Sequence, residues 1–335
     1  MAGPERNVPS AGRGSAGEPG RRPAAGNDRG GPSSDGAAVD DRPPERPSDG
    51  AVADGRLPDE DADGSAPGYP AVAGLTYQEM ESAALEGRQV AGPLEKETAL
   101  RLLREGDLTV VGRLMAASNA TFFCLVAGRG DDPAATIAAS CVYKPIRGER
   151  PLYDFPDGTL ACREVGAHAV SEASGWEIVP PTVMRDGPFG EGMVQLWMEV
   201  DESVDVAELI GSDSSALRRI AVLDAVLNNA DRKAGHLLPL PDGRIMGVDN
   251  GLCFAVEPKL RTVLWRWRGQ PLTGEERSIL GRLHDRLTGD LARELEPLLA
   301  PAELAAISRR IESLLAHGVL PRPDRNRPAI PWPPY

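Results

Sequence analysis

One stretch, residues 220–254, constrains the fold of this chain more than any other; it reads IAVLDAVLNNADRKAGHLLPLPDGRIMGVDNGLCF. It begins inside a predicted helix over 214–227 whose apolar residues cover most of its circumference, so that helix should be buried. A polar turn with Asp231 follows the helix, and a short hairpin around Gly243 leads to a second acidic turn at Asp249. The stretch therefore presents two carboxylates from two turns, one after a helix and one after a strand.

The pattern VLDxxxxNxDRxxxxxL followed by VDNGLCF resembles the catalytic and metal-binding loops of the phosphatidylinositol 3-/4-kinase-like superfamily. Type II phosphatidylinositol 4-kinases are its most similar branch, and HipA-type kinases and actin-fragmin kinase are more distant. The sequence is also similar to an actinobacterial family with this core. The resemblance covers roughly residues 107–260 and is strongest at the two loops.

The resemblance implies an α+β, two-lobed protein-kinase-like fold and ATP-dependent phosphoryl transfer. That reaction depends on positioning and electrostatic stabilisation more than on covalent chemistry. Asp231 would orient the acceptor hydroxyl or accept its proton, and Arg232 would neutralise charge that develops on the phosphate. Asp249 would bind Mg²⁺ through hard oxygen ligands.

The resemblance also places residues around the ATP phosphates. Lys144, at the end of a predicted third strand, would pair with the α- and β-phosphates. Glu164, on the helix predicted over 157–174, would orient the Lys144 ammonium group, and Glu172 on the same helix is the alternative. The Ser118-Asn119 turn of a predicted hairpin would offer backbone N–H groups to the phosphates.

The adenine would bind at the linker between the two lobes. Strands are predicted over 176–183 and 192–200, and the second, GMVQLWMEV, passes into acidic sequence as such a linker would. Backbone groups would hydrogen-bond the base and apolar side chains would enclose it. The linker residues concerned are Trp197, Met198 and Glu199.

One position departs from the family pattern. Related kinases usually have an Asn five residues after the catalytic Asp as a second metal ligand, and this chain has His236 there. Imidazole suits Mn²⁺ better than Mg²⁺. Three explanations are open: His236 and Asp249 bind a softer metal, Asn229 or Asn250 supplies the missing oxygen, or the domain binds nucleotide without catalysis. The expected cofactors are ATP with Mg²⁺ or Mn²⁺.

Charge and composition limit the possible partners. The chain has 335 residues and a net charge of −13 at pH 7, which argues against binding to nucleic acid or to anionic membranes. No apolar run is long enough to span a membrane, and the N-terminus lacks an apolar signal segment, so we expect a cytoplasmic protein without stable membrane insertion. The four cysteines form no CxxC pair, which argues against zinc and redox motifs.

The composition divides the chain into parts. A leader rich in Gly, Pro, Asp and Arg cannot bury enough apolar surface to fold, so it should be disordered. The predicted parts are the leader (1–74), an N-terminal β-rich lobe with leading helices (75–200), a helical lobe with the catalytic and metal loops (201–320) and a Pro-rich tail (321–335).

Start signals predict the helices of both lobes. Capping residues or prolines open each of them, at Thr76, Pro93, Asp157, Asp213, Thr273 and Pro301. The tail is either disordered or docked through Trp332 and Tyr335.

The leading prediction is an ATP-dependent phosphotransferase whose acceptor is a protein hydroxyl or a small-molecule hydroxyl. A phosphoinositide is the least expected acceptor, given the acidity of the chain. The alternatives are a nucleotide-binding pseudokinase that serves as a regulatory module, and an adenylyltransferase that binds the nucleotide inverted. Release of ADP, of pyrophosphate or of neither separates the three. Lack of nucleotide binding would favour a helical interaction protein.

Overall fold

The computed structural model describes residues 94–114, 117–129 and 136–335. The chain divides into two units, Met1–Gly50 and Ala51–Tyr335, and every described residue lies in the second. The predicted leader and the helix starts at Thr76 and Pro93 lie outside the described residues.

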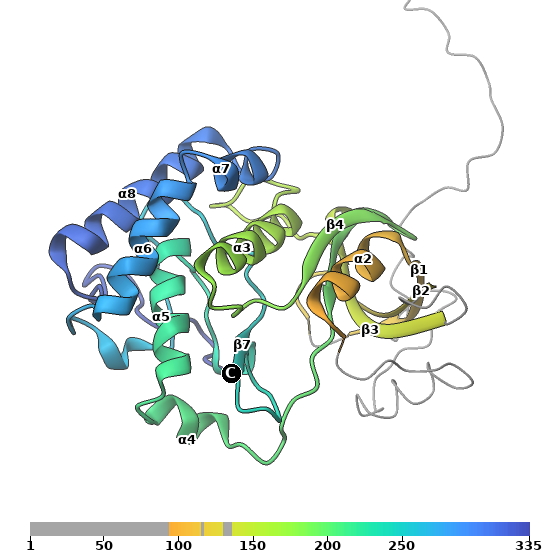
Figure 1. Cartoon of the computed structure of the whole chain (residues 1–335), viewed down its shortest axis with the longest axis horizontal. Helices are drawn as coiled ribbons and strands as arrows, with labels where there is room; N and C mark the ends of the chain where they lie inside the picture. The colour runs from red at the N-terminus through yellow and green to blue at the C-terminus, as the bar shows by residue number, and fades with distance from the viewer. Residues whose placement is uncertain (1–93, 115–116, 130–135) are drawn as a thin grey trace, which may run out of the picture. The chain divides into compact units, whose positions relative to one another are not determined.

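A five-stranded antiparallel sheet forms the core of the N-terminal lobe (Figure 1). It follows helix α2 (Lys96–Glu105), and its spatial order is β1-β2-β3-β5-β4. Its strands are β1 (Asp107–Arg113), β2 (Phe122–Arg129), β3 (Thr136–Pro145), β4 (Thr182–Gly187) and β5 (Gly190–Leu196). This order makes β3, which carries Lys144 near its end, the central strand.

One face of this sheet packs against α2. Leu102 and Leu103 of the helix join Phe122, Cys124 and Val126 of β2 in one apolar cluster. Alternate residues of β2 point to this face, as the pleat of a strand requires. The hairpin expected between the first two strands is confirmed by the antiparallel pairing of β1 with β2.

The strand predicted over 176–183 is wrong for most of its length, because β4 begins only at Thr182. Pro180 and Pro181 have no N–H to donate to a ladder. The backbone N–H groups of Ile178 and Val179 instead donate to Ser171 Oγ, at 2.8 and 3.0 Å.

Helix α3 (Leu160–Ser174) follows β3, and its N-cap position is Thr159, the last of the three residues predicted to cap it. Asp157 does not cap it. The carboxylate of Glu149 accepts hydrogen bonds from the first backbone N–H groups, Leu160 N at 3.1 Å and Ala161 N at 2.8 Å. An acidic side chain is favourable at this end because the helix dipole is positive there.

The C-terminal lobe is mainly helical. Its helices are α4 (Val206–Gly211), α5 (Ser215–Leu227), α6 (Gly274–Arg286), α7 (Asp290–Leu295) and α8 (Pro301–His317). Helix α8 packs against both α5 and α6 (Figure 1). A hairpin of β6 (Leu237–Pro239) and β7 (Ile245–Gly247) follows the 3₁₀ turn η2 (Ala234–His236). Two further 3₁₀ turns are η1 (Ile146–Gly148) and η3 (Trp265–Trp267).

Helix α5 is the buried helix that the sequence predicts. Leu217, Ile220, Leu223 and Leu227 on it are fully buried in the main apolar cluster of the lobe. Ser214 rather than Asp213 caps it, accepting a hydrogen bond from Leu217 N at 3.3 Å.

The capping box at the start of α6 is confirmed. Thr273 N donates to Glu276 Oε2 at 2.8 Å, and Glu276 N donates to Thr273 Oγ1 at 3.1 Å. The two-lobed, kinase-like α+β architecture expected from the sequence is therefore confirmed: an antiparallel sheet with α3 packed against β4 and β5, followed by a helical lobe that carries both loops.

The tail returns to the catalytic turn through its backbone. Pro334 O accepts a hydrogen bond from Ala234 N at 2.8 Å, and Ala329 O accepts one from Trp265 Nε1 at 2.8 Å. The side chain of Trp332 does not dock, being 89% exposed, and Tyr335 is also exposed.

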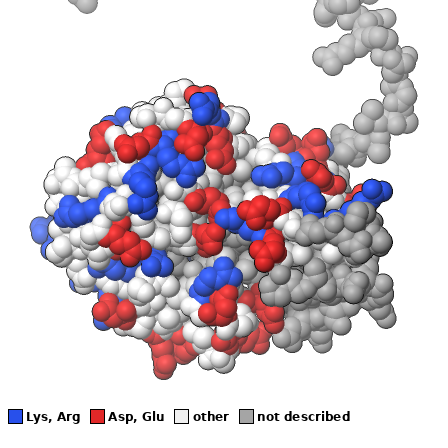
Figure 2. Space-filling view, viewed as in Figure 1, with Lys and Arg blue, Asp and Glu red and all other residues white. Residues whose placement is uncertain are grey.

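On the surface, basic and acidic side chains are interspersed over the face drawn in Figure 2. Within the described parts of the chain, no helix is both long and apolar enough to cross a membrane.

Candidate active site

Lys144 joins two carboxylates that come from distant parts of the chain. Its Nζ lies 2.7 Å from Glu164 Oε1 and 2.8 Å from Asp249 Oδ1. Burial lowers the pKa of Lys144, but the negative charges of Asp249 and Glu164 outweigh burial and raise the pKa overall. Lys144 is therefore a fixed cation between α3 and the loop after β7.

Glu164 is the partner of Lys144, and Glu172 is not. The Glu164 side chain is only 2% exposed, and its second oxygen, Oε2, accepts a hydrogen bond from Asn250 N at 2.8 Å. Glu172 instead pairs with Lys96 at 2.7 Å. Glu164 thus holds the strand lysine with one oxygen and the backbone of the acidic loop with the other.

Asp249 follows β7 in the left-handed backbone region, with a φ of 57°. Asp tolerates this conformation better than most residues. The positive charge of Lys144 lowers the pKa of Asp249 against the opposing effect of burial, so the carboxylate is ionised. Half of the side-chain surface remains exposed, which leaves the carboxylate open to a ligand.

His236 lies beside Asp249, with Nε2 at 3.3 Å from Asp249 Oδ2. Burial lowers the pKa of His236 to about 4, so the ring is neutral at pH 7. Lys233 N donates to His236 Nδ1 at 3.4 Å, so Nδ1 carries no proton and Nε2 does. In this tautomer Nε2, which lies 3.3 Å from Asp249 Oδ2, carries the proton and has no lone pair for a metal. The expected ligand role of His236 therefore requires the opposite tautomer and loss of the Lys233 hydrogen bond.

Asp231 lies in the turn after α5. Asn228 ends the helix in the left-handed region, and Asn229 Oδ1 then accepts a hydrogen bond from Asp231 N at 2.9 Å. The Asp231 carboxylate lies 3.2 Å from Lys233 Nζ and 3.9 Å from Arg261 Nη2. Burial raises the pKa of Asp231 against the effect of Lys233, which suits a group that accepts a proton.

Arg232 does not face this site, contrary to the sequence prediction. Its side chain is fully buried and pairs with the equally buried Asp224 at 2.9 Å. Its Nη1 donates to Val248 O at 2.6 Å and its Nη2 to Asn250 Oδ1 at 2.7 Å. With these partners the guanidinium group cannot neutralise a phosphate. It fixes the catalytic turn to the acidic loop instead.

The same contacts answer one of the open questions about the metal. Asn250 Oδ1 is occupied by Arg232, and Asn229 Oδ1 by Asp231 N. Both asparagine side chains are buried. In this structure both oxygens therefore serve hydrogen bonds within the protein. Within the described residues, no group of three or more His, Cys, Asp and Glu side chains is gathered as a metal cluster.

Two further regions were predicted to contact ATP: the hairpin turn at Ser118-Asn119 and the linker that begins at Trp197. In the hairpin turn, Ser118 is exposed and Asn119 Oδ1 accepts a hydrogen bond from Arg150 N at 2.9 Å, which ties the turn to the loop after β3. In the linker, Trp197 N donates to Ser140 O at 3.0 Å.

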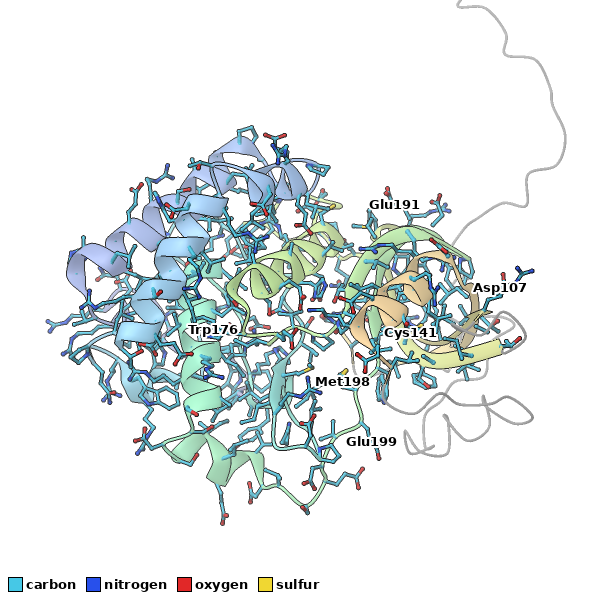
Figure 3. The ribbon with its side chains drawn as sticks, viewed as in Figure 1. Asp107, Cys141, Trp176, Glu191, Met198 and Glu199 are labelled. Carbon is cyan, nitrogen blue, oxygen red and sulfur yellow. The ribbon has the colours of Figure 1, made fainter. Side chains whose placement is uncertain are left out.

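Met198 and Glu199 lie on the segment that runs from β5 toward α4 (Figure 3). Glu199 is exposed there and Met198 is partly buried.

Asp224 is the site residue that sequence reasoning missed. An Asp at the centre of the apolar run AVLDAVL is unusual, since charged residues are rarely fully buried without a partner. That position was a signal for a buried ion pair, and its partner Arg232 lies eight residues later, in the turn after α5.

Comparison with curated proteins gives 43% identity over 269 residues to "Protein Rv2133c" of Mycobacterium tuberculosis (strain ATCC 25618 / H37Rv). The aligned region covers 70% of this chain and 94% of that protein. The chain belongs to the family of Protein Rv2133c. No family model matches the chain.

The solved structures to which this chain is similar include kinases. The golgi casein kinase has 15% identity and a TM-score of 0.42, covering 66% of this chain and 74% of that chain. The structure of hydra Fam20 with sugar has 13% identity and a TM-score of 0.41, and the match covers 71% of this chain and 93% of that chain. The Helicobacter pylori proinflammatory kinase CtkA has 10% identity and a TM-score of 0.36, and the match covers 65% of this chain and 94% of that chain. TM-scores this low carry no argument, so the function is argued from the site.

Proposed function

We propose that the protein is an ATP-dependent phosphotransferase that moves the γ-phosphate of ATP to a hydroxyl acceptor. The observation that carries the proposal is the contact of Lys144 with both Glu164 and Asp249, close to a second acidic turn at Asp231. A kinase needs these charges in this relation: a cation for the phosphates, a metal ligand and a carboxylate for the acceptor. The similarity of the two loops to the phosphatidylinositol 3-/4-kinase-like superfamily supports the same assignment.

The proposed nucleotide site uses the N-terminal lobe and the linker. Lys144, oriented by Glu164, binds the α- and β-phosphates. The Ser118-Asn119 turn adds backbone N–H groups above them. Adenine lies against the linker, whose residues are Trp197, Met198 and Glu199.

The proposed metal ligand is Asp249. Its donor chemistry fits Mg²⁺ or Mn²⁺, because it is an ionised, half-exposed carboxylate. A bound divalent cation would neutralise the phosphate oxygens. His236 lies beside this carboxylate, with Nε2 at 3.3 Å from the second oxygen of Asp249.

Asp231 acts on the acceptor. The hydroxyl oxygen of the acceptor forms a bond to the γ-phosphorus while the bond from that phosphorus to the β,γ-bridging oxygen breaks, and ADP leaves. The hydroxyl proton goes to the Asp231 carboxylate, whose raised pKa makes it a better base than an exposed Asp.

A pseudokinase is the second candidate, and one observation favours it. Asn229 and Asn250 are held in buried hydrogen bonds, and His236 is in the tautomer that carries its proton on Nε2, the atom nearer to Asp249. The site then has Asp249 as its protein ligand for a metal. Nucleotide binding without transfer is consistent with that arrangement.

ATP turnover by the wild type and Asp231→Asn tests the proposal, with ADP release measured in Mg²⁺ and in Mn²⁺. Positioning and proton acceptance are worth about 10²–10⁴-fold, so Asp231→Asn should lose that much turnover while its ATP affinity changes by less than about twofold. Asp242→Asn, in the exposed turn of the β6–β7 hairpin, is the matched control and should change neither.

The other outcomes of this turnover experiment identify the alternative functions. ATP binding without ADP release, with water or with the acceptors tested below, identifies a pseudokinase. Pyrophosphate release identifies an adenylyltransferase. A wild type that binds no ATP overturns the proposed function.

A further inference from the structure

A cavity of about 1110 Å³ lies in the helical lobe beside the catalytic turn. Its walls come from segments far apart in the sequence: the loop before α3, the end of α5, the segment after the acidic loop, helix α8 and the start of the tail. Cavities of roughly 300–1,000 Å³ are typical of small-molecule sites. Neither Lys144 nor Asp249 lines it, so it is separate from the proposed nucleotide site.

The lining of this cavity is basic, although the chain is acidic. Six lining residues are Lys or Arg and three are Asp or Glu, a difference of +3, whereas the whole chain carries −13. On the face drawn in Figure 2, by contrast, the two signs are interspersed. The basic residues are Lys259, Arg261, Arg309, Arg310, Arg322 and Arg327, and the acidic residues are Asp154, Glu257 and Asp324.

Arg310 in the wall has an unsatisfied guanidinium nitrogen. Its Nε donates to Val226 O at 2.7 Å and its Nη1 to Ala255 O at 3.2 Å. Its Nη2 is buried, and the described residues give it no hydrogen-bond partner. Burial lowers the pKa of Arg310 to about 10. A buried guanidinium group with an unpaired N–H donor is costly, and an anion in the cavity would offset that cost.

Arg261 lies between the cavity and the carboxylate of Asp231. It lines the cavity, its Nε donates to Ala230 O at 2.6 Å, and its Nη2 lies 3.9 Å from Asp231 Oδ1. Asp231 itself does not line the cavity, but a molecule that contacts Arg261 there is one side chain away from the carboxylate to which we assign the acceptor proton. The cavity is placed to hold an acceptor rather than ATP.

We propose that this cavity is the acceptor site and that the acceptor is a small organic phosphate ester with a free hydroxyl group. This inference rests on the proposed phosphotransferase function. Guanidinium groups bind phosphate oxygens through two N–H donors at once, which a surplus of arginines favours. The ester phosphate binds among the arginines, and the free hydroxyl reaches Asp231 and attacks the γ-phosphorus of ATP. Its proton passes to Asp231 and ADP leaves.

Five separate parts of the chain line the cavity, which is open to solvent on one side. A compact phosphate ester is the ligand that we assign to it, and an acidic peptide is the alternative that the experiment tests. The same phosphate ester chemistry occurs in free sugar or polyol phosphates and in phospholipid headgroups. The experiment distinguishes these two sources.

Calorimetric titration of the full chain, with a non-hydrolysable ATP analogue and Mg²⁺ present, tests the proposal. The probes are inorganic phosphate, glycerol 3-phosphate and, as the uncharged comparison, glycerol. We expect glycerol 3-phosphate to bind and glycerol not to bind. Arg309→Gln and Arg322→Gln together should weaken the binding of glycerol 3-phosphate, raising its Kd at least tenfold.

Arg282→Gln is the matched control for charge. Arg282 is exposed on α6 and does not line the cavity, so its loss should change the affinity by less than about twofold. Arg322 packs against Gly269, and if the double variant has a lower melting temperature, Arg309→Gln alone replaces it. Arg309 is exposed, so its substitution leaves the packing intact.

Three results overturn the inference: no binding of either phosphate probe, equal weakening by Arg282→Gln, or stronger binding of an acidic peptide than of glycerol 3-phosphate. Vesicles of phosphatidylcholine with phosphatidylinositol, bound more tightly than the free ester, would confirm the site and assign the lipid source. Titration of the ATP analogue alone separates the two proposals. If it binds and the phosphate probes do not, the acceptor site fails and the nucleotide site stands. If it does not bind, the proposed function fails.

Discussion

Replacement of Lys144 by Met tests the nucleotide site most directly. Met keeps the length of the side chain and removes the charge that contacts Glu164 and Asp249 at 2.7 and 2.8 Å. If Lys144 binds phosphates, ATP must lose affinity while adenosine, which has no phosphate, must not. The comparison of two ligands separates a lost phosphate contact from a general loss of structure.

The expected magnitude follows from the contacts. A hydrogen bond to a charged group contributes about 1.5–3 kcal/mol, which is roughly 10- to 150-fold in the Kd for ATP. The variant also leaves the buried Glu164 with only its Asn250 hydrogen bond, at a cost of about 1–3 kcal/mol of stability. That is less than the loss of a fully buried ion pair, because Lys144 is 21% exposed and Asp249 is half exposed.

Calorimetric titration of ATP and of adenosine, well below the melting temperature of the variant, is the assay. Lys96→Met is a matched control, because Lys96 also joins two carboxylates, Glu172 and Glu177, both at 2.7 Å. It should leave both affinities unchanged. Equal weakening of ATP and adenosine by Lys144→Met, or no weakening of ATP, would refute the assignment of Lys144 to the phosphates.

Three further predictions follow from other contacts. Arg232→Met should cost about 3–5 kcal/mol in urea unfolding, because the buried Asp224 carboxylate loses its cation, and combination with Asp224→Leu should recover part of that loss; a loss equal to the sum of the single variants would show that the pair does not interact. His236→Asn should leave the ratio of Mg²⁺- to Mn²⁺-supported turnover unchanged, since Nδ1 of His236 accepts from Lys233 N and its protonated Nε2 offers no lone pair, and a shift toward Mg²⁺ would identify it as a metal ligand. A chain that begins at Leu75 should melt within about 2 °C of the full chain, because the composition before it cannot form a core.

The two acidic turns were predictable because their signals are local. A buried helix, a polar run and a hairpin turn lie within one short stretch, and each has its own pattern. The pairing of Lys144 with Glu164 was a longer-range prediction, and it held because the family resemblance supplies the order of strand and helix. The contact at 2.7 Å confirms that geometry, while the catalytic roles of these residues remain predictions.

The role assigned to Arg232 failed for a physical reason. Neighbouring residues in an extended turn point in different directions, so a position next to Asp231 does not place Arg232 at the same site. Its direction is set by Asp224, which lies one helical turn and a bend earlier in the chain and needs a buried cation. The pattern of the loop alone does not contain that information.

The cavity was beyond sequence reasoning because it is made by parts of the chain that are far apart. Arg261 and Arg310 are separated by the whole of α6 and α7, and only packing brings them to one wall. The strand over 176–183, in contrast, was a misreading of a visible signal, since Pro180-Pro181 already excluded a regular ladder.

Buried contacts join the catalytic turn to the cation that would bind the nucleotide. Six residues form a continuous series of hydrogen bonds and ion pairs, in which each residue contacts the next. In order they are Asp224, Arg232, Asn250, Glu164, Lys144 and Asp249. Buried, fully satisfied polar networks keep their members in one arrangement, because any displacement leaves a group unpaired in a low dielectric. The positions of Asp231 and Asp249 are therefore set together, through Arg232, rather than independently by their own loops. This accounts for a buried arginine directly after Asp231, the residue to which we assign the acceptor proton: Arg232 holds the two acidic turns at a fixed separation.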